Sequence, residues 1–345
     1  MKRLVDKLWD EHRLTPDEYR ALLIMRDAQD IDYLMDQART VSQLHFGRGI
    51  YLRGLIELSN VCRNDCLYCG IRRSNCHVER YTLSHDQVLA CCEQGYKIGF
   101  RTFVLQGGEW GEERSRWIAD LIGDIKKGWP DCAVTLSLGE HPRETYALWR
   151  DAGADRYLLR HETHHPRLYS LLHPQGMSLA QRLQCLDWLK ELGFQVGTGI
   201  MVGAPFQTLG SIIEDIEYLV DFQPQMIGLG PFIPHHDTPF RRFPAGSVEM
   251  TAKLYAILRL AMPKTLIPST TAMATLAPDG RCRGILAGAN VVMPNLSPTD
   301  TRKQYSLYDN KAALGAESAQ GVKILADELA AIGYHIDWSR GDSPQ

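Results

Sequence analysis

Eight short apolar segments, rich in β-branched residues, recur along the chain and are separated by amphipathic stretches. Several of these stretches begin at Ser or Thr and end at Gly, as helices commonly do. Eight strands that alternate with helices predict a complete (β/α)8 TIM-type barrel, an α/β fold, with an open doubly wound sheet as the alternative. The expected strands span residues 50–59, 102–107, 133–139, 156–162, 196–203, 226–232, 265–271 and 289–295.

The first 48 residues are expected to form a helical extension that packs on the barrel. Within it, Thr15, Pro16 and Glu18 follow the pattern of a helix start, with a capping residue, a proline in the first turn and an acid three residues after the cap. Residues 49–345 are expected to form the barrel together with a C-terminal helix, and a length of 345 residues suits one such unit.

The composition argues against several classes of partner. A formal net charge of −3 leaves no basic footprint for nucleic acid or for an anionic membrane. The charged N-terminus does not resemble a signal peptide, and no apolar run is long enough to span a membrane. We therefore expect a cytoplasmic protein with reduced cysteines.

Polar residues cluster where the expected strands end. They lie at 106–109, 137–140, 160–163, 199–203, 231–236, 269–273 and 294–295. In a barrel of this type the carboxyl ends of the strands form the catalytic face. His235 and His236 could suggest a metal pair, but adjacent residues on extended backbone point apart, so we expect solvated loop histidines.

The stretch "SNVCRNDCLYCGIRRSNC" places Cys62, Cys66 and Cys69 in a C-x3-C-x2-C pattern directly after the first barrel strand. A zinc site would need a fourth ligand, for which Cys76 or His77 is the nearest candidate. Three thiolates around a [4Fe–4S] cluster with one open iron fit the spacing better. Cys76 is left out of the expected ligand set. Four further cysteines are expected to be small buried apolar residues: Cys91, Cys92, Cys132 and Cys185.

This motif, with an aromatic residue before its last cysteine, resembles the signature of the radical S-adenosylmethionine (SAM) superfamily. "GGE" at 107–109 and "GTGIMVG" at 197–203 resemble its SAM-binding motifs. Longer blocks, including "GADRYLLRHET", "IPSTTAMAT" and "GANVVMPNLSPTDTRKQYSLY", resemble the HydE family of [FeFe]-hydrogenase maturases over about residues 50–310. Biotin synthase and methylornithine synthase look like more distant relatives.

The resemblance implies one [4Fe–4S] cluster on Cys62, Cys66 and Cys69, together with SAM. No cysteine follows Cys282, so a second cluster is not expected. The resemblance places Glu162 at the SAM ribose and Arg182 at the SAM carboxylate, near Arg160. The full expected SAM set is Gly107, Gly108, Glu109, Ser137, Arg160, Glu162 and Arg182. The expected substrate set is Thr135, Arg156, Met226, Thr270, Thr271, Met293, Tyr305 and Tyr308.

The function implied is a radical SAM enzyme of H-cluster assembly. Reductive cleavage of SAM would give a 5′-deoxyadenosyl radical that acts on an Fe(CO)2(CN)-cysteine-type precursor. The implied partners are a reductant such as a ferredoxin or flavodoxin and the other hydrogenase maturases. Two alternatives stay open: a radical SAM enzyme acting on a small amino acid, like methylornithine synthase, and a non-catalytic zinc- or cluster-binding scaffold.

Overall fold

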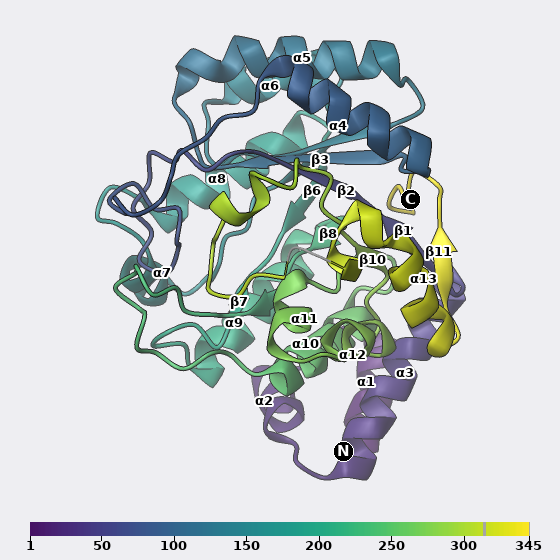
Figure 1. Ribbon diagram of the computed structural model, residues 1–345. Helices are drawn as coiled ribbons and strands as arrows, with labels where there is room; N and C mark the ends of the chain where they lie inside the picture. The colour runs from purple at the N-terminus through teal and green to yellow at the C-terminus, as the bar shows by residue number, and fades with distance from the viewer. Residues whose placement is uncertain (313–314, 345) are drawn as a thin grey trace.

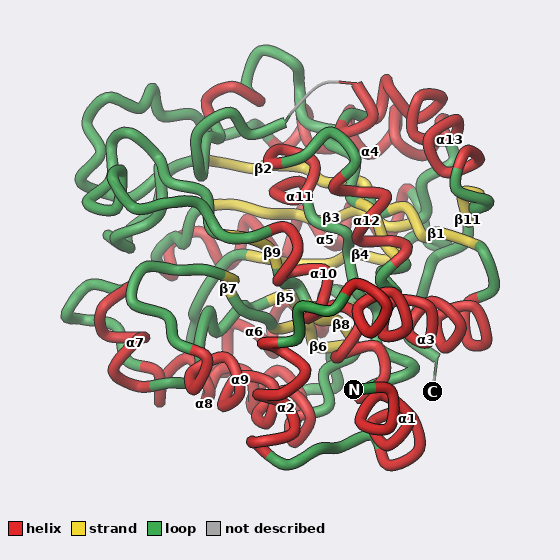
Figure 2. Tube along the Cα trace, turned by 90° about the horizontal axis from the view of Figure 1, so that it is seen from below, coloured by secondary structure: helices red, strands yellow, loops and turns green. Residues whose placement is uncertain are grey.

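The computed structural model describes residues 1–312 and 315–344. Six parallel strands form one sheet in which each strand pairs with the next of the six (Figure 1). The long loops gather at one end of these strands (Figure 2), which places the polar segments of the sequence on a common face. The six strands are β2 (Gly54–Ser59), β3 (Thr102–Gly107), β4 (Ala133–Ser137), β5 (Arg156–Leu158), β6 (Gln195–Thr198) and β8 (Met226–Ile227).

Two further strand positions close the ring. Leu266 forms a parallel bridge with β8, and Pro268 forms one with β10 (Val291–Val292). β10 in turn pairs in parallel with β1 (Gly49–Leu52), which leads into β2. The sheet therefore closes into a complete eight-position barrel, as predicted, and the open-sheet alternative is wrong.

The seventh position is shorter than predicted. Only Leu266 and Pro268 take part in bridges, and α11 (Thr271–Leu276) begins where the strand was expected to continue. Proline has no N–H to donate to a ladder, so Pro268 limits pairing at this position. Thr271 consequently belongs to a helix rather than to a strand.

The fifth and sixth predicted strands are each split in two. β7 (Met201–Val202) and β9 (Gly230–Pro231) form a separate parallel pair above β6 and β8. The break follows from a close approach of two backbones, because a Cβ atom at Gly199 would lie 1.9 Å from the carbonyl oxygen of Gly228. Only glycine allows this contact, and beyond it the two chains diverge toward the loops.

Helices cover the outside of the barrel, and the sequence explains where they start. Ser84 and Thr208 each form a capping box at the beginning of a helix. The covering helices are α4 (His85–Ile98), α5 (Ser115–Gly128), α6 (Arg143–Asp151), α7 (Pro166–Leu172), α8 (Leu179–Glu191), α9 (Leu209–Phe222), α10 (Val248–Ala261), α12 (Gly280–Leu286) and α13 (Val322–Ala331). Short 3-10 turns lie at η1 (Glu112–Arg114), η2 (Arg302–Gln304), η3 (Gly315–Glu317) and η4 (Ala319–Gly321).

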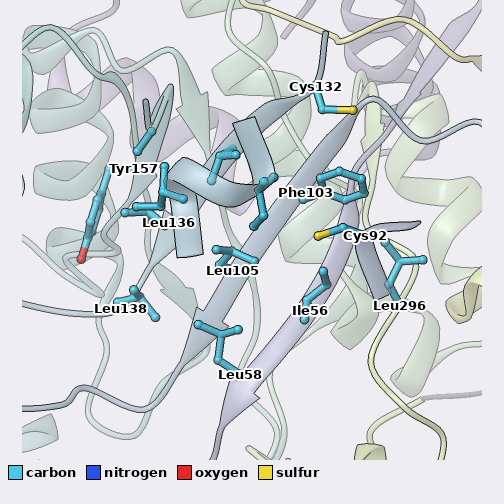
Figure 3. Close-up of a cluster of buried hydrophobic side chains, with 14 of the residues drawn as sticks. Ile56, Leu58, Cys92, Phe103, Leu105, Cys132, Leu136, Leu138, Tyr157 and Leu296 are labelled. Carbon is cyan, nitrogen blue, oxygen red and sulfur yellow. The ribbon is translucent and has the colours of Figure 1, made fainter. Parts of the chain in front are cut away.

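Strand residues alternate between this helical layer and the barrel interior. Ile56, Leu58 and Leu105 belong to the buried core between strands and helices, where Cys92 and Cys132 also lie (Figure 3). Intervening residues on the same strands face inward. The strand register then places Glu57, Gln106 and Ser137 side by side in one inward layer, with Leu55, Val104 and Thr135 in the layer below.

The N-terminal residues form α1 (Lys2–Glu11), α2 (Pro16–Ile24) and α3 (Ala28–Phe46). The predicted capping box is present, since the Thr15 side chain accepts from the Glu18 N–H and the Glu18 carboxylate accepts from the Thr15 N–H. Residues of α2 and α3 share an apolar core with α9 and α10. The division of the chain at residue 48 stays a prediction. In the described part of the chain, no helix has both the length and the apolar character needed to cross a membrane.

The C-terminal residues close the barrel at the end opposite the loops. β11 (His335–Asp337) pairs with β1 outside the ring. Beyond it, Asp342 accepts from the Arg156 guanidinium, and Arg340 forms an ion pair with Asp155. Burial alone would raise the pKa of Asp342, but Arg156 and Arg340 outweigh it and hold that pKa below its usual value. These ion pairs fix the tail across the lower mouth.

We predict that Asp342→Ala destabilises the protein, because it leaves the buried Arg156 without its carboxylate. The cost should fall between the ~1 kcal/mol of an exposed pair and the ~3–5 kcal/mol of a fully buried one. A carboxylate whose pKa is lowered by folding stabilises the fold above its unfolded pKa of about 3.9 and loses that effect as pH falls through the folded value. The denaturant concentration at the midpoint of unfolding should therefore be higher for the wild type than for the variant at pH 7. The two midpoints should become equal at pH values below the folded-state pKa of Asp342.

Asp327→Ala is the matched control, since its pair with Lys323 lies on the surface. It should change the free energy of unfolding by less than about 0.5 kcal/mol. A midpoint of Asp342→Ala equal to that of the control would contradict the proposed sealing of the lower mouth.

Candidate functional site

The three-cysteine loop follows β2 at the upper mouth of the barrel, and the Arg80 guanidinium is one of the groups that hold it. Arg80 donates to the carbonyl oxygens of Asn60, Ile71, Arg72 and Asn75, at 2.5–3.0 Å. One side chain thus joins the beginning and the end of the loop. Sequence reasoning missed Arg80, because the partners of its guanidinium are backbone groups that only the folded loop brings together.

Cys62, Cys66 and Cys69 are half-buried free thiols on this loop. Burial raises the pKa of Cys69 to about 12, and the neighbouring Cys62 thiol adds to the rise. Burial also raises the pKa of Cys66, and Cys69 and Cys62 add to that rise. Thiols in this state are protonated at neutral pH, so binding of a metal centre must release protons from them.

The fourth-ligand candidates do not complete a zinc site. Cys76 is exposed, and the ring of His77 is hydrogen-bonded to Asp237 at 2.9 Å. A closed structural zinc site needs four converging protein ligands. The donor set of three thiols on one loop therefore fits a centre with one position left open to a small molecule.

A turn with two glycines packs directly against the cysteine loop. A Cβ atom at Gly108 would lie 2.2 Å from the Val61 carbonyl oxygen and 2.8 Å from the Cys62 Cβ. Gly107 ends β3, and the Gly108 N–H donates to the Ser59 carbonyl oxygen at 3.0 Å. The absence of a side chain at Gly108 is what allows the end of β3 to reach the base of the loop.

Glu109 follows these glycines and is nearly buried. Its carboxylate accepts from Arg63 Nε at 2.9 Å and from the Glu140 N–H at 2.8 Å. A Cβ atom at Gly139 would lie 2.1 Å from Glu109 Oε2, so the absence of a side chain at Gly139 makes room for the Glu109 carboxylate. Arg63 and Glu140 were not singled out from the sequence, although Glu140 lies within a polar segment that was.

The other expected SAM residues join Glu109 in one connected set. Arg182 Nε donates to Glu140 Oε1 at 2.5 Å, and Arg182 Nη1 donates to the Arg160 carbonyl oxygen at 2.9 Å. Arg160 Nη2 donates to Glu162 Oε2 at 2.8 Å. Burial raises the pKa of Glu140, and Arg182 offsets part of that rise. The structure thus brings Glu109, Arg160, Glu162 and Arg182 together through Glu140. Ser137 ends β4, beside Gln106 of β3.

Two features of this set indicate a binding role. Glu162 has a φ of 65°, a left-handed conformation that costs a non-glycine residue about 1–3 kcal/mol. Arg160 Nε is buried and has no hydrogen-bond partner among the described residues. Strained backbone and orphaned buried donors are concentrated at binding sites.

The eight expected substrate residues are divided between two heights of the barrel. Thr135, Arg156 and Met226 line a cavity at the lower end, together with Arg53. Met293 packs beside Met226 in an apolar cluster. Near the upper end, Tyr305 contacts Gln106, Thr270 lies against Gly230, and Thr271 donates to Glu317. Tyr308 lies three residues beyond Tyr305, and burial raises its pKa while the Thr275 side chain lowers it.

Arg156, from the expected substrate set, and Arg160, from the expected SAM set, lie in different parts of the barrel. The two residues are four positions apart along the chain, about 13 Å on an extended strand. Arg156 donates to Thr102 and to the C-terminal tail, whereas Arg160 belongs to the upper set. Alternation placed both side chains on the inner face, but height along the barrel separates them.

The expectation for the two histidines was wrong for His235. This side chain is 3% exposed and packs against Gly70, immediately after Cys69. The rings of His235 and His236 are stacked, with centroids 4.4 Å apart, and His236 is hydrogen-bonded to Asp309. The backbone turns here instead of staying extended, so the two side chains lie on the same side.

Known proteins are similar to this one over most of the chain, including the barrel. The Radical SAM superfamily profile matches residues 56–219. The [FeFe] hydrogenase maturase subunit HydE of Thermotoga maritima is 41% identical over 310 residues, which is 90% of this chain and 88% of that protein. A 3-methylornithine synthase of Methanosarcina acetivorans is 30% identical over 88% of this chain and 85% of its own. The crystal structure of methylornithine synthase (PylB) superimposes with a TM-score of 0.85, 27% identity and 97% coverage of both chains.

We predict that Gly108→Ala lowers the iron and sulfide content of anaerobically reconstituted protein to less than half of the wild-type value. The added methyl group would push the Val61–Cys62 backbone away and misplace the first thiol. Gly123→Ala is the control, because a Cβ atom there meets no other atom within 4 Å. Equal iron content in the two variants would mean that the loop does not depend on this contact.

Proposed function

The chain belongs to the radical SAM superfamily, and from that premise we propose that it is a maturase of [FeFe]-hydrogenase, acting on an Fe(CO)2(CN)-cysteine-type precursor during H-cluster assembly. The main support is 41% identity to a HydE maturase over about nine tenths of both chains, against 30% to a methylornithine synthase. The superfamily implies a [4Fe–4S] cluster and SAM. When bound, these supply a 5′-deoxyadenosyl radical by reductive cleavage of SAM.

We assign Cys62, Cys66 and Cys69 as the thiolates that would hold the cluster. Arg80 fixes the ends of their loop, and Gly108 allows the loop to pack on β3. We propose a single cluster, because Cys282 is the last cysteine of the sequence. About four irons per chain are expected for it.

The connected charges from Glu109 to Glu162 are the proposed SAM clamp, with Gly107 and Ser137 at its edge. The SAM carboxylate would bind Arg182, because Glu140 already holds this buried guanidinium in a fixed position. Glu162 would accept from ribose hydroxyls, and Glu109 from the SAM amino group. The role of each side chain is to position SAM rather than to react.

The interior suits a ligand that must be kept from water. Tyr305, in the segment that follows β10, is 2% exposed at the upper end, and the C-terminal tail closes the lower mouth. Between them lie Met226 and Met293 with apolar neighbours. Thioether and hydroxyl groups are soft or neutral contacts and suit a polarisable metal carbonyl. Such a cytoplasmic enzyme would need an electron donor, such as a ferredoxin or flavodoxin, and the other maturases as partners.

An enzyme that acts on a small amino acid is the second candidate. The structural likeness to methylornithine synthase and a buried carboxylate inside the barrel, Glu57, favour it. Both candidates use the same cluster and SAM residues, so variants in those residues test the shared chemistry and not the choice of substrate.

We predict that Arg182→Ala and Glu162→Gln weaken SAM binding while leaving iron content near normal. Each removes one charged hydrogen bond, worth about 1.5–3 kcal/mol, or roughly ten- to hundredfold in affinity. Equilibrium binding of SAM to the reconstituted protein measures this. Arg143→Ala is the control, since Arg143 lies on the surface beside Glu191. If both variants bind SAM as tightly as the wild type, SAM must bind at other residues and the proposed clamp is wrong.

The deciding experiment is hydrogenase maturation in cells that lack their own HydE but keep the other maturases. The wild-type chain should restore hydrogenase activity, Cys69→Ala should not, and Cys76→Ala should behave as wild type. Failure of the wild type, together with SAM cleavage stimulated by a free amino acid, would replace the proposed function with the second candidate.

A further inference from the structure

A carboxylate that sequence reasoning overlooked lies inside the barrel. Glu57 is 0% exposed and stands on β2 between Ile56 and Leu58, both of which face the outer core. Its side chain therefore faces inward, beside Gln106 of β3. Glu57 lies two residues before the end of the strand that leads into the cysteine loop.

One oxygen of this carboxylate is paired and the other is not. Lys311 Nζ donates to Glu57 Oε1 and to the Tyr305 carbonyl oxygen, and it lies 4.7 Å from the centroid of the Tyr305 ring. Glu57 Oε2 is buried and has no hydrogen-bond partner in the described part of the chain. An acceptor in this position loses its hydration without compensation unless a ligand supplies a donor.

A second buried group that has no hydrogen-bond partner in the described structure belongs to another part of the barrel wall and has the opposite character, because Arg160 follows β5. Arg160 Nε is a buried donor without a partner among the residues described. Burial raises the pKa of Tyr308, the Thr275 side chain opposes that rise, and the charges of Glu317 and Glu57 add to it. Among the described residues, the barrel thus offers a buried acceptor at Glu57 and a buried donor at Arg160.

We propose that Glu57 is a substrate-binding residue whose Oε2 accepts a hydrogen bond from an amino group of the molecule in the barrel, while Lys311 supplies the counter-charge and positions Tyr305. The ligand class is an amino acid or an amino-acid derivative, with its amino group at Glu57 and its carboxylate toward Arg160. The inference rests on the proposed function only in placing the substrate inside the barrel, and it holds for either candidate.

A purely structural role explains the pair less well. Two buried charges are rarely more stabilising than well-packed apolar residues of the same size. Neutralisation of Glu57 would explain the presence of Lys311. It would not explain why a carboxylate with an unpaired oxygen lies inside the barrel. Recognition of an amine needs such a free oxygen, because Lys311 already occupies the other one.

The test is binding of S-methyl-L-cysteine and its N-acetyl form to the reconstituted, SAM-loaded protein by calorimetry. The methyl group prevents binding through a thiol. Wild type should prefer the free amine by roughly ten- to hundredfold, the range for one charged hydrogen bond. In Glu57→Gln this preference should fall below threefold. The penalty for converting the probe's carboxylate to an amide should not change, because Arg160 is intact.

Two further variants separate recognition from a general loosening of the fold. Asp309→Asn weakens the same segment through His236 and should keep the preference for the amine. The double variant Glu57→Gln/Lys311→Met removes both buried charges, should unfold at a higher temperature than Glu57→Gln alone, and should still lack the preference. If Asp309→Asn also loses the preference for the free amine, that preference depends on the order of the segment around Asp309 rather than on Glu57, and the proposal is overturned.

The outcomes also distinguish this inference from the proposed function. Absence of an amine preference in the wild type, or its survival in Glu57→Gln, overturns the role of Glu57 even if the chain restores hydrogenase maturation. A clear preference that depends on Glu57, in a chain that fails to restore maturation, supports the inference and removes only the maturase assignment.

Discussion

Charges inside a closed barrel must be paired, and this constraint organises the interior. An isolated buried charge costs several kcal/mol, so most buried carboxylates and guanidinium groups here have a partner of opposite charge. Arg53 is the exception in the lower cavity, because among the described residues it donates only to the Met226 sulfur and the Gly341 carbonyl oxygen. Glu109 has Arg63, Glu140 has Arg182, Glu162 has Arg160, and Glu57 has Lys311. These pairs bind the ends of different strands to one another and leave only particular atoms free to meet a ligand.

The same constraint explains how both ends of the barrel are closed. At the upper end Lys311 reaches down to Glu57 and holds the segment with Tyr305 across the mouth. At the lower end Asp342 neutralises Arg156. A reaction that uses a radical needs a space without bulk water, and here the residues that exclude water also neutralise the buried charges.

Much of this arrangement could be predicted from the sequence. The eight apolar segments predicted the barrel, and its closure through Leu266 and Pro268 confirmed it. The sequence showed the three cysteines after the first barrel strand and two glycines at the end of the second, and the structure places Gly108 against Cys62. These predictions succeeded because periodicity and motif spacing are local properties that fix the direction of a side chain and the end of a strand. The binding roles of the individual residues stay predictions.

The sequence by itself determined the fold class, the strand order and the membership of the radical SAM superfamily, because alternation and contiguous motifs are written along the chain. Only the tertiary structure decided which buried charges meet. It separated Arg156 from Arg160, buried His235 against the cysteine loop, and joined Glu57 to Lys311 across 254 residues of sequence. The physical reason is that height along a barrel and contacts between distant segments depend on strand register and on loop paths, and no local pattern in the sequence records either.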